Sequence, residues 1–114
     1  MGLKRCAVLT VLLAASILLS GCGKSVPPDR AAYVGEWQSR EMYLSITEDG
    51  SVRYKRVSRG VSKSLSAPLR SFEGDNFIVG LPFMSTTFVV SKPPYEEHGR
   101  WKMIVDGVML TRGW

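Results

Sequence analysis

The dipeptide Asp106-Gly107 constrains the fold of this chain most strongly, because alternating segments, 101–105 and 108–112, stand on both sides of it. An Asp-Gly pair in this setting is typical of a two-residue type I′ turn, in which both residues take positive φ. The turn predicts the cross-strand pairs Val105–Val108, Met103–Leu110 and Trp101–Arg112. The last pair brings an indole to a guanidinium, so we expect a cation–π contact worth about 0.5–1 kcal/mol if exposed.

A second hairpin is predicted over 42–58, around Glu48-Asp49-Gly50. Apolar and polar residues alternate before the turn, as in a half-buried strand. A two-residue loop would set Ile46 opposite Arg53, whereas a three-residue loop with a left-handed glycine sets Ile46 opposite Val52. The second register keeps one face apolar and is the one we predict. It gives the pairs Ile46–Val52 and Leu44–Tyr54.

The middle of the chain predicts weaker strands. Residues 65–72 form a strand that Pro68 confines to an edge or a bulge, and 73–76 turn the chain. The run 77–90 is the most hydrophobic after the N-terminal segment and predicts two buried strands joined by 80–84. The apolar joining loop is either tucked over an open barrel end, which we favour, or a protein contact patch.

These patterns predict an all-β fold: an antiparallel meander of short strands, forming a small sandwich or a partly open barrel. The folded part is expected to be one domain, 33–114. That length is close to the size at which core burial is only just sufficient for stability.

The N-terminus carries Lys4 and Arg5, an uncharged stretch 7–20, and then Leu19-Ser20-Gly21-Cys22. This order resembles the signal peptide and lipobox of bacterial lipoprotein precursors. The resemblance implies a helical signal peptide, 1–21, that is removed in front of Cys22. The alternative is an uncleaved membrane helix, because 6–23 holds no charge and approaches the length needed to span a bilayer.

The lipobox resemblance also implies that the Cys22 thiol carries acyl chains, of which two or three hold a protein durably in a membrane. In Gram-negative lipoproteins, an Asp directly after the acylated Cys resembles a signal for retention in the inner membrane. This chain has Gly23 at that position. The expected location is the cell envelope, on the outer membrane facing the periplasm if the organism is Gram-negative. Residues 22–32, with paired prolines, are expected to be an extended, flexible tether that keeps the domain near the membrane.

Removal of the signal peptide takes Lys4 and Arg5 but no acid, so the formal charge of +5 falls to +3. Cys6 leaves with the signal peptide and Cys22 is acylated. The compartment permits disulfides, but the folded part then has no thiol to form one.

The motif Gly35-x-Trp37 resembles the first strand of lipocalins and smaller lipocalin-like domains, where the Trp closes one barrel end under an Arg from a late strand. The resemblance implies that role for Trp37 and Arg112. The other interpretation is a glycine at a strand start followed by an ordinary core tryptophan. The chain is too short for the eight long strands of a lipocalin barrel.

Residues 51–71 contain basic residues and no acid. One interpretation is a basic face that meets an anionic surface, and the other is a solvated strand face followed by a polar flexible loop over 60–66. Nucleic acid is not an expected partner, because no aromatic residue interleaves with the charges between Tyr54 and Phe72. On the first interpretation, the residues expected to contact the anionic surface are Arg53, Lys55, Arg56 and Arg59.

Catalytic and metal motifs are not found. The single His98 lies beside Glu96 and Glu97 in the segment 93–99, which we expect to be a structural loop. A zinc site needs three or four ligands, and a catalytic centre needs a nucleophile with its base or suitably spaced carboxylates. We therefore expect no metal, no cofactor and no enzymatic activity.

The chain as a whole resembles a group of small bacterial lipoproteins of no known activity, through a Tyr-Val-Gly-x-Trp opening at 33–37, the Pro93-Pro94 segment and the closing hairpin 101–112. The sequence thus predicts a lipid-anchored, non-enzymatic binding or structural module near the membrane. Its partner would be an anionic envelope component or an envelope protein. The alternatives are a lipocalin-like carrier of a small apolar ligand and a periplasmic enzyme inhibitor. The oligomeric state is left open.

Overall fold

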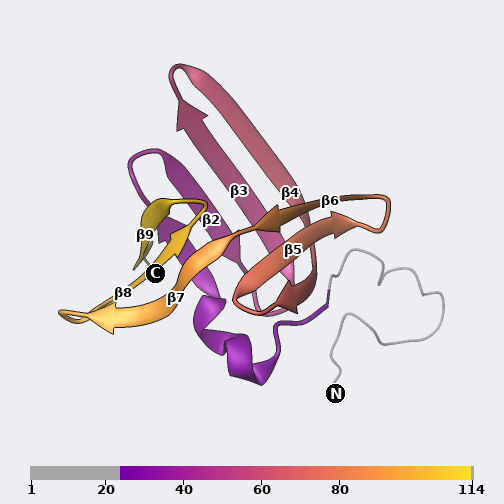
Figure 1. The fold of residues 1–114 in the computed structure, drawn as a ribbon, viewed down its shortest axis with the longest axis horizontal. Helices are drawn as coiled ribbons and strands as arrows, with labels where there is room; N and C mark the ends of the chain where they lie inside the picture. The colour runs from indigo at the N-terminus through magenta and orange to yellow at the C-terminus, as the bar shows by residue number, and fades with distance from the viewer. Residues whose placement is uncertain (1–23, 114) are drawn as a thin grey trace.

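The computed structural model describes residues 24–113 and shows an all-β protein with one short helix (Figure 1). The helix is η2, a 3₁₀-helix over Pro28–Tyr33. The strands are β1 (Gly35–Gln38), β2 (Met42–Ile46), β3 (Ser51–Ser58), β4 (Val61–Glu73), β5 (Asn76–Leu81), β6 (Met84–Phe88), β7 (Val90–Glu97), β8 (Arg100–Val105) and β9 (Val108–Gly113). Within this range no helix has the length and apolar character needed to cross a membrane. The expected signal peptide lies outside the described residues.

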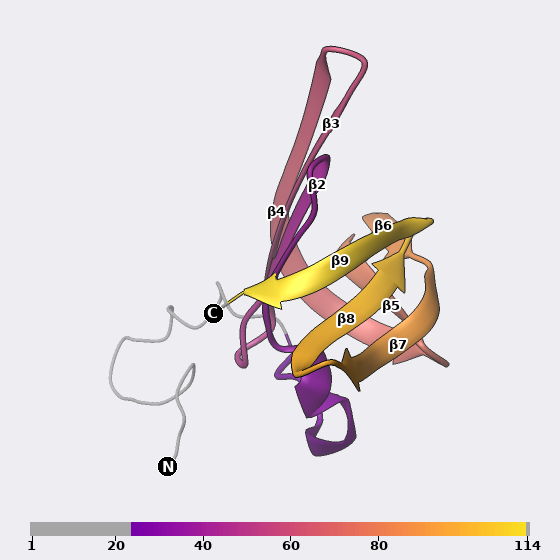
Figure 2. The same ribbon diagram turned by 90° about the vertical axis from the view of Figure 1, so that its left-hand side faces the viewer.

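All nine strands belong to one antiparallel sheet in the order β6-β5-β4-β3-β2-β1-β9-β8-β7. Neighbours in the sequence are neighbours in the sheet, except that β6 and β7 form its two opposite edges and β9 returns to pair with β1. The sheet curls into a half-barrel, as the two perpendicular views show (Figures 1 and 2). The expected all-β class and antiparallel arrangement are confirmed, and the partly open barrel is the form that the sheet takes.

The two hairpins predicted from turn chemistry have the predicted registers. Ile46 pairs with Val52 around a left-handed Gly50, whose φ is 89°. At the other hairpin, Asp106 and Gly107 have φ values of 49° and 80°, as a type I′ turn requires. The pairs there are Val105–Val108 and Met103–Leu110, and those of the first hairpin include Leu44–Tyr54.

The β3–β4 hairpin is longer than predicted, and it rises away from the rest of the half-barrel (Figure 2). The polar loop expected over 60–66 is wrong, because β4 begins at Val61 and its residues 61–68 pair with all of β3. A tight turn made by Arg59 and Gly60, with φ values of 52° and 79°, joins the strands. The serines and Lys63 are tolerated in this part of β4 because its side chains are exposed or half-buried.

Pro68 lies where β4 changes partners. Residues 61–68 pair with β3, whereas 69–73 pair with β5 after a register shift between Leu69 and Ser71. A proline lacks the N–H that a second neighbour would need, so it fits a strand edge beside an irregularity. The prediction of an edge or a bulge at Pro68 is confirmed.

The segment before β1 lies against the sheet, and the extended tether expected there is wrong for residues 24–32. The Lys24 N–H donates to the Leu69 carbonyl at 3.2 Å, and the Val26 N–H donates to the Glu48 carbonyl at 3.0 Å. Pro28 opens the 3₁₀-helix near its first position, where a missing N–H costs nothing. Residues 24–32 are therefore packed against the β domain.

The core fills the concave side of the half-barrel. The rings of Phe77 and Phe88 stack with their centroids 4.9 Å apart, and Tyr54 meets Phe88 edge-on at 5.1 Å. Tyr33 from η2 closes the bottom through an edge contact with Phe72 at 5.0 Å. The side chains that are less than 2% exposed are Trp37, Phe77, Phe88, Leu44, Ile46, Met103, Leu110, Val52, Val79 and Val105.

The β5–β6 hairpin departs from the prediction of two buried strands. Phe88 is the only buried residue of β6, and the joining turn is limited to Pro82 and Phe83 because Leu81 pairs with Met84. Phe83 is 81% exposed. The favoured prediction of a loop tucked over the barrel end is therefore wrong.

Candidate functional site

The predicted acylation residue Cys22 and the cleavage residues Leu19, Ser20 and Gly21 lie outside the described residues. Lys24, two positions after Cys22, is the first described residue and is hydrogen-bonded to β4. A trans peptide unit spans about 3.8 Å between Cα atoms. The backbone therefore allows Cys22 a separation of at most about 7–8 Å from Lys24.

Trp37 and Arg112 are cross-strand partners on β1 and β9. The guanidinium of Arg112 lies 5.7 Å from the Trp37 ring centroid and 5.2 Å from that of Trp101, so the cation–π contact predicted between Trp101 and Arg112 is present. The Arg112 Nη1 also donates to the carbonyls of Ala32 and Val34, at 3.4 and 3.3 Å. This arrangement ties the end of η2 to the last strand.

Gly35 is required where the Arg112 side chain crosses the start of β1. A Cβ at position 35 would lie 2.6 Å from the Arg112 Cδ, and Gly35 has a φ of 144°. Trp37 is fully buried, and its Nε1 donates to the Tyr33 carbonyl at 2.9 Å. The Gly-x-Trp motif and the late Arg thus form one packing unit in this chain.

The four basic residues named for anionic contact do not share one face. Side chains alternate along β3, so Arg53 and Lys55 lie on one side of the sheet and Arg56 lies on the other. Arg56 is half-buried and its Nη2 lies 3.3 Å from a carboxylate oxygen of Glu41. Arg59 stands in the turn at the far end of the hairpin. A single basic face made by all four residues is therefore wrong.

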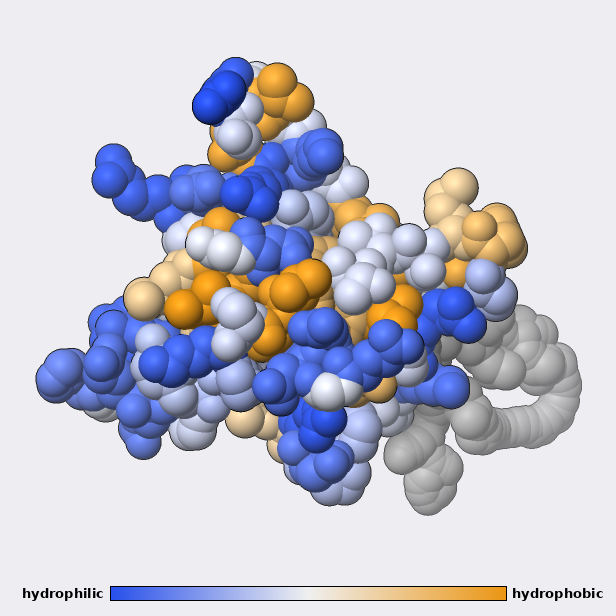
Figure 3. Space-filling view, viewed as in Figure 1, coloured by the Kyte–Doolittle hydropathy of each residue, from blue (hydrophilic) through white to orange (hydrophobic). Residues whose placement is uncertain are grey.

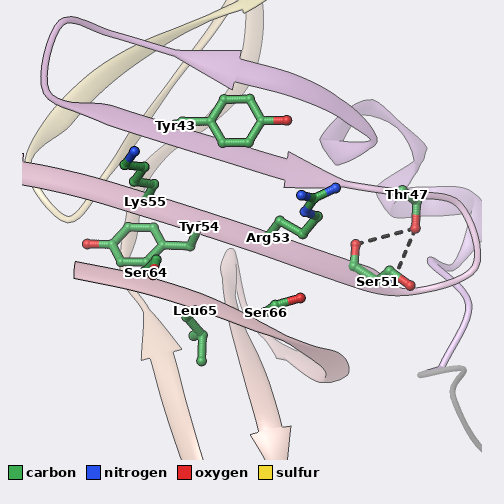
Figure 4. Close-up of a pocket in the computed structure, with 9 residues that line it drawn as sticks. All are labelled: Tyr43, Thr47, Ser51, Arg53, Tyr54, Lys55, Ser64, Leu65 and Ser66. Carbon is green, nitrogen blue, oxygen red and sulfur yellow. Dashed lines mark hydrogen bonds between the residues drawn. The ribbon is translucent and has the colours of Figure 1, made fainter. Parts of the chain in front are cut away.

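Arg53 and Lys55 do share a shallow groove on the outer face of β2, β3 and β4 (Figure 4). The cross-strand rows Tyr43–Lys55–Ser64 and Ser45–Arg53–Ser66 place hydroxyls beside each cation. The groove has a volume of about 760 Å³, and none of its lining residues is acidic. These residues are Tyr43, Thr47, Ser51, Arg53, Tyr54, Lys55, Ser64, Leu65 and Ser66.

The chemistry of this outer groove favours an anionic, hydroxyl-rich ligand. Two exposed cations supply charge, serine and threonine hydroxyls can donate or accept, and Tyr43 offers a ring face. Arg53 and Lys55 were identified from the sequence as candidate binding residues. Ser64 and Ser66 were not, because 60–66 was expected to be a loop. The alternation of Ser62, Ser64 and Ser66 is the signal that would have placed them on one strand face.

A second groove, of about 550 Å³, opens on the concave side between the β3–β4 hairpin and β6. Its floor is made by Tyr54, Leu65 and Phe88, and Arg56 and Asp106 lie among its other lining residues. Beneath the floor the core is packed with fully buried side chains. The space is thus an open groove above a filled interior.

Tyr33 fastens η2 to the β4–β5 turn. Its hydroxyl donates to the Asp75 carbonyl at 2.8 Å, and the Arg30 Nη2 donates to the Gly74 carbonyl at 2.7 Å. Burial of the phenol, together with the nearby Asp75 carboxylate, raises the pKa of Tyr33 above its ordinary value of 10.0, against a smaller lowering by Arg30. These contacts hold the N-terminal segment in place.

The segment 93–99 is not the expected loop. Pro93 and Pro94 lie within β7, an edge strand that tolerates prolines because one side needs no N–H partner. Only His98 and Gly99 form the turn, with φ values of 54° and 77°. The described residues contain no group of three or more His, Cys, Asp or Glu side chains that could hold a metal ion.

No protein-family model, no curated protein and no solved structure matches this chain.

Proposed function

We propose that this chain is a lipid-anchored protein of the bacterial cell envelope, in which a half-barrel presents a non-enzymatic binding surface close to the membrane. The address rests on the lipobox-like sequence Leu19-Ser20-Gly21-Cys22 behind an uncharged stretch. The docked position of Lys24 supports a short distance between anchor and domain, because only Gly23 separates it from Cys22. In a cell with two membranes, the Gly at position 23 favours the outer membrane.

The outer groove carries the binding proposal. Arg53 and Lys55 are exposed, share one sheet face and have no carboxylate among their neighbours in the groove. An anionic envelope component, such as a phosphorylated glycan, fits this set of donors. Each cation that meets an anionic surface contributes about 1 kcal/mol.

The lipocalin-like carrier is a second candidate, favoured by the apolar floor of the concave groove at Tyr54, Leu65 and Phe88. The packed core beneath that floor leaves a bound ligand in contact with solvent. Native mass spectrometry of the protein purified in mild detergent distinguishes the two candidates. A co-purifying apolar molecule, lost in a Leu65→Ser variant, would favour the carrier.

The anchor is tested by the intact mass and membrane fractionation of wild type and Cys22→Ser. The expected result is an acylated wild type in the membrane fraction and an unacylated variant that is not processed in the same way. A wild type without fatty acid, or a variant that matures and fractionates like it, contradicts the proposal.

The binding surface is tested by retention of the mature protein on phosphocellulose. Arg53→Gln/Lys55→Gln removes two charges from the groove, whereas Arg56→Gln/Arg59→Gln removes two charges outside it. We expect the first variant to elute at clearly lower salt and the second to stay nearer to wild type. Equal losses would mean that only net charge matters. Pull-down of envelope components with wild type and with the same two double variants identifies the partner.

A further inference from the structure

The turn between β5 and β6 exposes an apolar surface without visible cover in the described part of the chain. Leu81 is 47% exposed, Phe83 81% and Met84 72%. Figure 3 shows this end of the hairpin as an apolar projection on the right-hand side of the molecule. Phe83 stands at the tip of a tight turn, so its ring meets solvent on most sides.

The hairpin that carries this surface is free of charge. Between Asp75 and Lys92 the sequence contains no acidic or basic residue. The exposed side chains next to the tip are small and neutral, at Ser85, Thr86 and Thr87. A hairpin of this composition can enter a bilayer interface without the large cost of desolvating a charge.

The apolar turn also lies near the start of the described chain. The Lys24 N–H is bonded to the Leu69 carbonyl, and Leu69 is the cross-strand partner of Val79 on β5. Leu81 is two residues beyond Val79, about 7 Å along the strand. In Figure 1 the β5–β6 turn and the indigo segment that begins the described chain both lie in the right-hand half of the molecule.

The β3–β4 hairpin points elsewhere. Its base is the pair Ser51–Pro68. This base adjoins the segment 24–26, whose backbone N–H groups bond to the carbonyls of Glu48 and Leu69. Its tip lies about 25 Å away, at roughly 3.3 Å per residue over the eight residues of β3. The tip also exposes an apolar residue, Val61, which is 62% exposed but stands beside Arg59.

We propose that the turn Leu81–Met84 inserts into the leaflet that holds the acyl chains of Cys22, as a second membrane contact that fixes the orientation of the domain. The inference rests on the acylation proposed above. Three apolar side chains and a proline supply the inserted surface, and the β3–β4 hairpin is held pointing away from the bilayer. The bilayer is favoured over a protein partner because the turn combines a charge-free hairpin with a position next to the anchor.

The test uses single cysteines labelled with an environment-sensitive nitrobenzoxadiazole dye. Phe83→Cys places the dye at the proposed contact, and Val61→Cys places it on another exposed apolar site, at the distal hairpin tip. Each variant keeps Cys22, which is blocked by acylation, and the mature protein is reconstituted into vesicles of phosphatidylethanolamine and phosphatidylglycerol. Lipids with a doxyl group on the acyl chain serve as quenchers.

We expect the dye at position 83 to shift to shorter emission wavelength and to lose most of its fluorescence to the doxyl lipids, while the dye at position 61 does neither. An acylated, vesicle-bound protein whose position 83 is neither shifted nor quenched overturns this inference and leaves the anchor intact. Shielding of position 83 in native envelopes but not in lipid vesicles overturns it in favour of a protein partner. A mature chain without acyl groups overturns the proposed function together with the inference.

Discussion

Arg112 crosses from the last strand to Trp37 on the first, with its guanidinium 5.7 Å from the Trp37 ring centroid and 5.2 Å from that of Trp101. The β1–β9 pairing makes the two ends of the meander neighbours, and this cluster is where they meet. Two carbonyls of the η2 region accept hydrogen bonds from the same guanidinium. One side chain thus joins three parts of the fold.

Arg112→Lys should destabilise the domain. A lysine cannot stack a planar group against two indoles and donate to two carbonyls at once. We expect a loss of about 1–2 kcal/mol in the free energy of unfolding, measured by urea denaturation of the mature protein. Arg100→Lys, at an exposed position of β8, is the control and should stay within about 0.5 kcal/mol of wild type. Equal effects would contradict a special role for Arg112.

The turn at Gly107 gives a test of backbone conformation that is free of steric clash. A Cβ at this position would meet no atom within 4 Å, but the φ of 80° disfavours a β-branched residue. Gly107→Val should lower the unfolding free energy by about 1–2 kcal/mol. Gly107→Asn, which tolerates this conformation, should cost clearly less. If the two variants unfold alike, the type I′ turn is not what holds this hairpin.

Tyr33 predicts a stability difference that depends on alkaline pH. Because the pKa of Tyr33 is raised in the folded state, the phenol's contribution is complete below pH 10.0 and is lost as pH rises through the folded pKa. Tyr33→Phe removes the hydrogen bond to Asp75 and should cost about 1 kcal/mol at neutral pH. The gap between wild type and variant, measured by denaturation at several pH values, should narrow above pH 10. A gap that is constant with pH would refute this role.

Arg59→Asn should stabilise the tip of the β3–β4 hairpin. Arg59 has a φ of 52° in a tight turn before Gly60, and asparagine populates this region more readily than arginine. We expect amide hydrogen exchange at Ser58 and Val61, the pair that flanks the turn, to slow, while exchange at the core residue Leu44 stays unchanged. Faster exchange at the tip would contradict the turn assignment.

The parts of the fold that local chemistry determines could be predicted from the sequence. Asp106-Gly107 and Gly50 set the registers of two hairpins, because loop length and the apolar face admit one solution each. Pro68 could be placed at an edge or bulge, because a missing N–H has local consequences. The contact between Trp101 and Arg112 followed from the register alone.

The errors arose where long-range packing decided the outcome. Residues 24–32 looked like a tether because prolines and polar residues show no periodicity, yet the backbone N–H groups of Lys24 and Val26 bond to β4 and to the turn between β2 and β3. The serines of 60–66 looked like a loop because β propensity was low, but pairing with β3 along the whole hairpin prevails. The apolar turn at Phe83 looked like core, since composition does not reveal which side of a turn faces solvent.

The bonds at Lys24 and Val26 shorten the reach of the domain. Ten free residues between Cys22 and residue 33 would let the half-barrel sweep an area several nanometres across, at about 3 Å per extended residue. In the lipid-anchored protein proposed above, the hydrogen bond at Lys24 leaves only Gly23 between the docked segment and Cys22. On that proposal a partner must diffuse to the protein, because the domain has no long linker on which to move over the membrane surface.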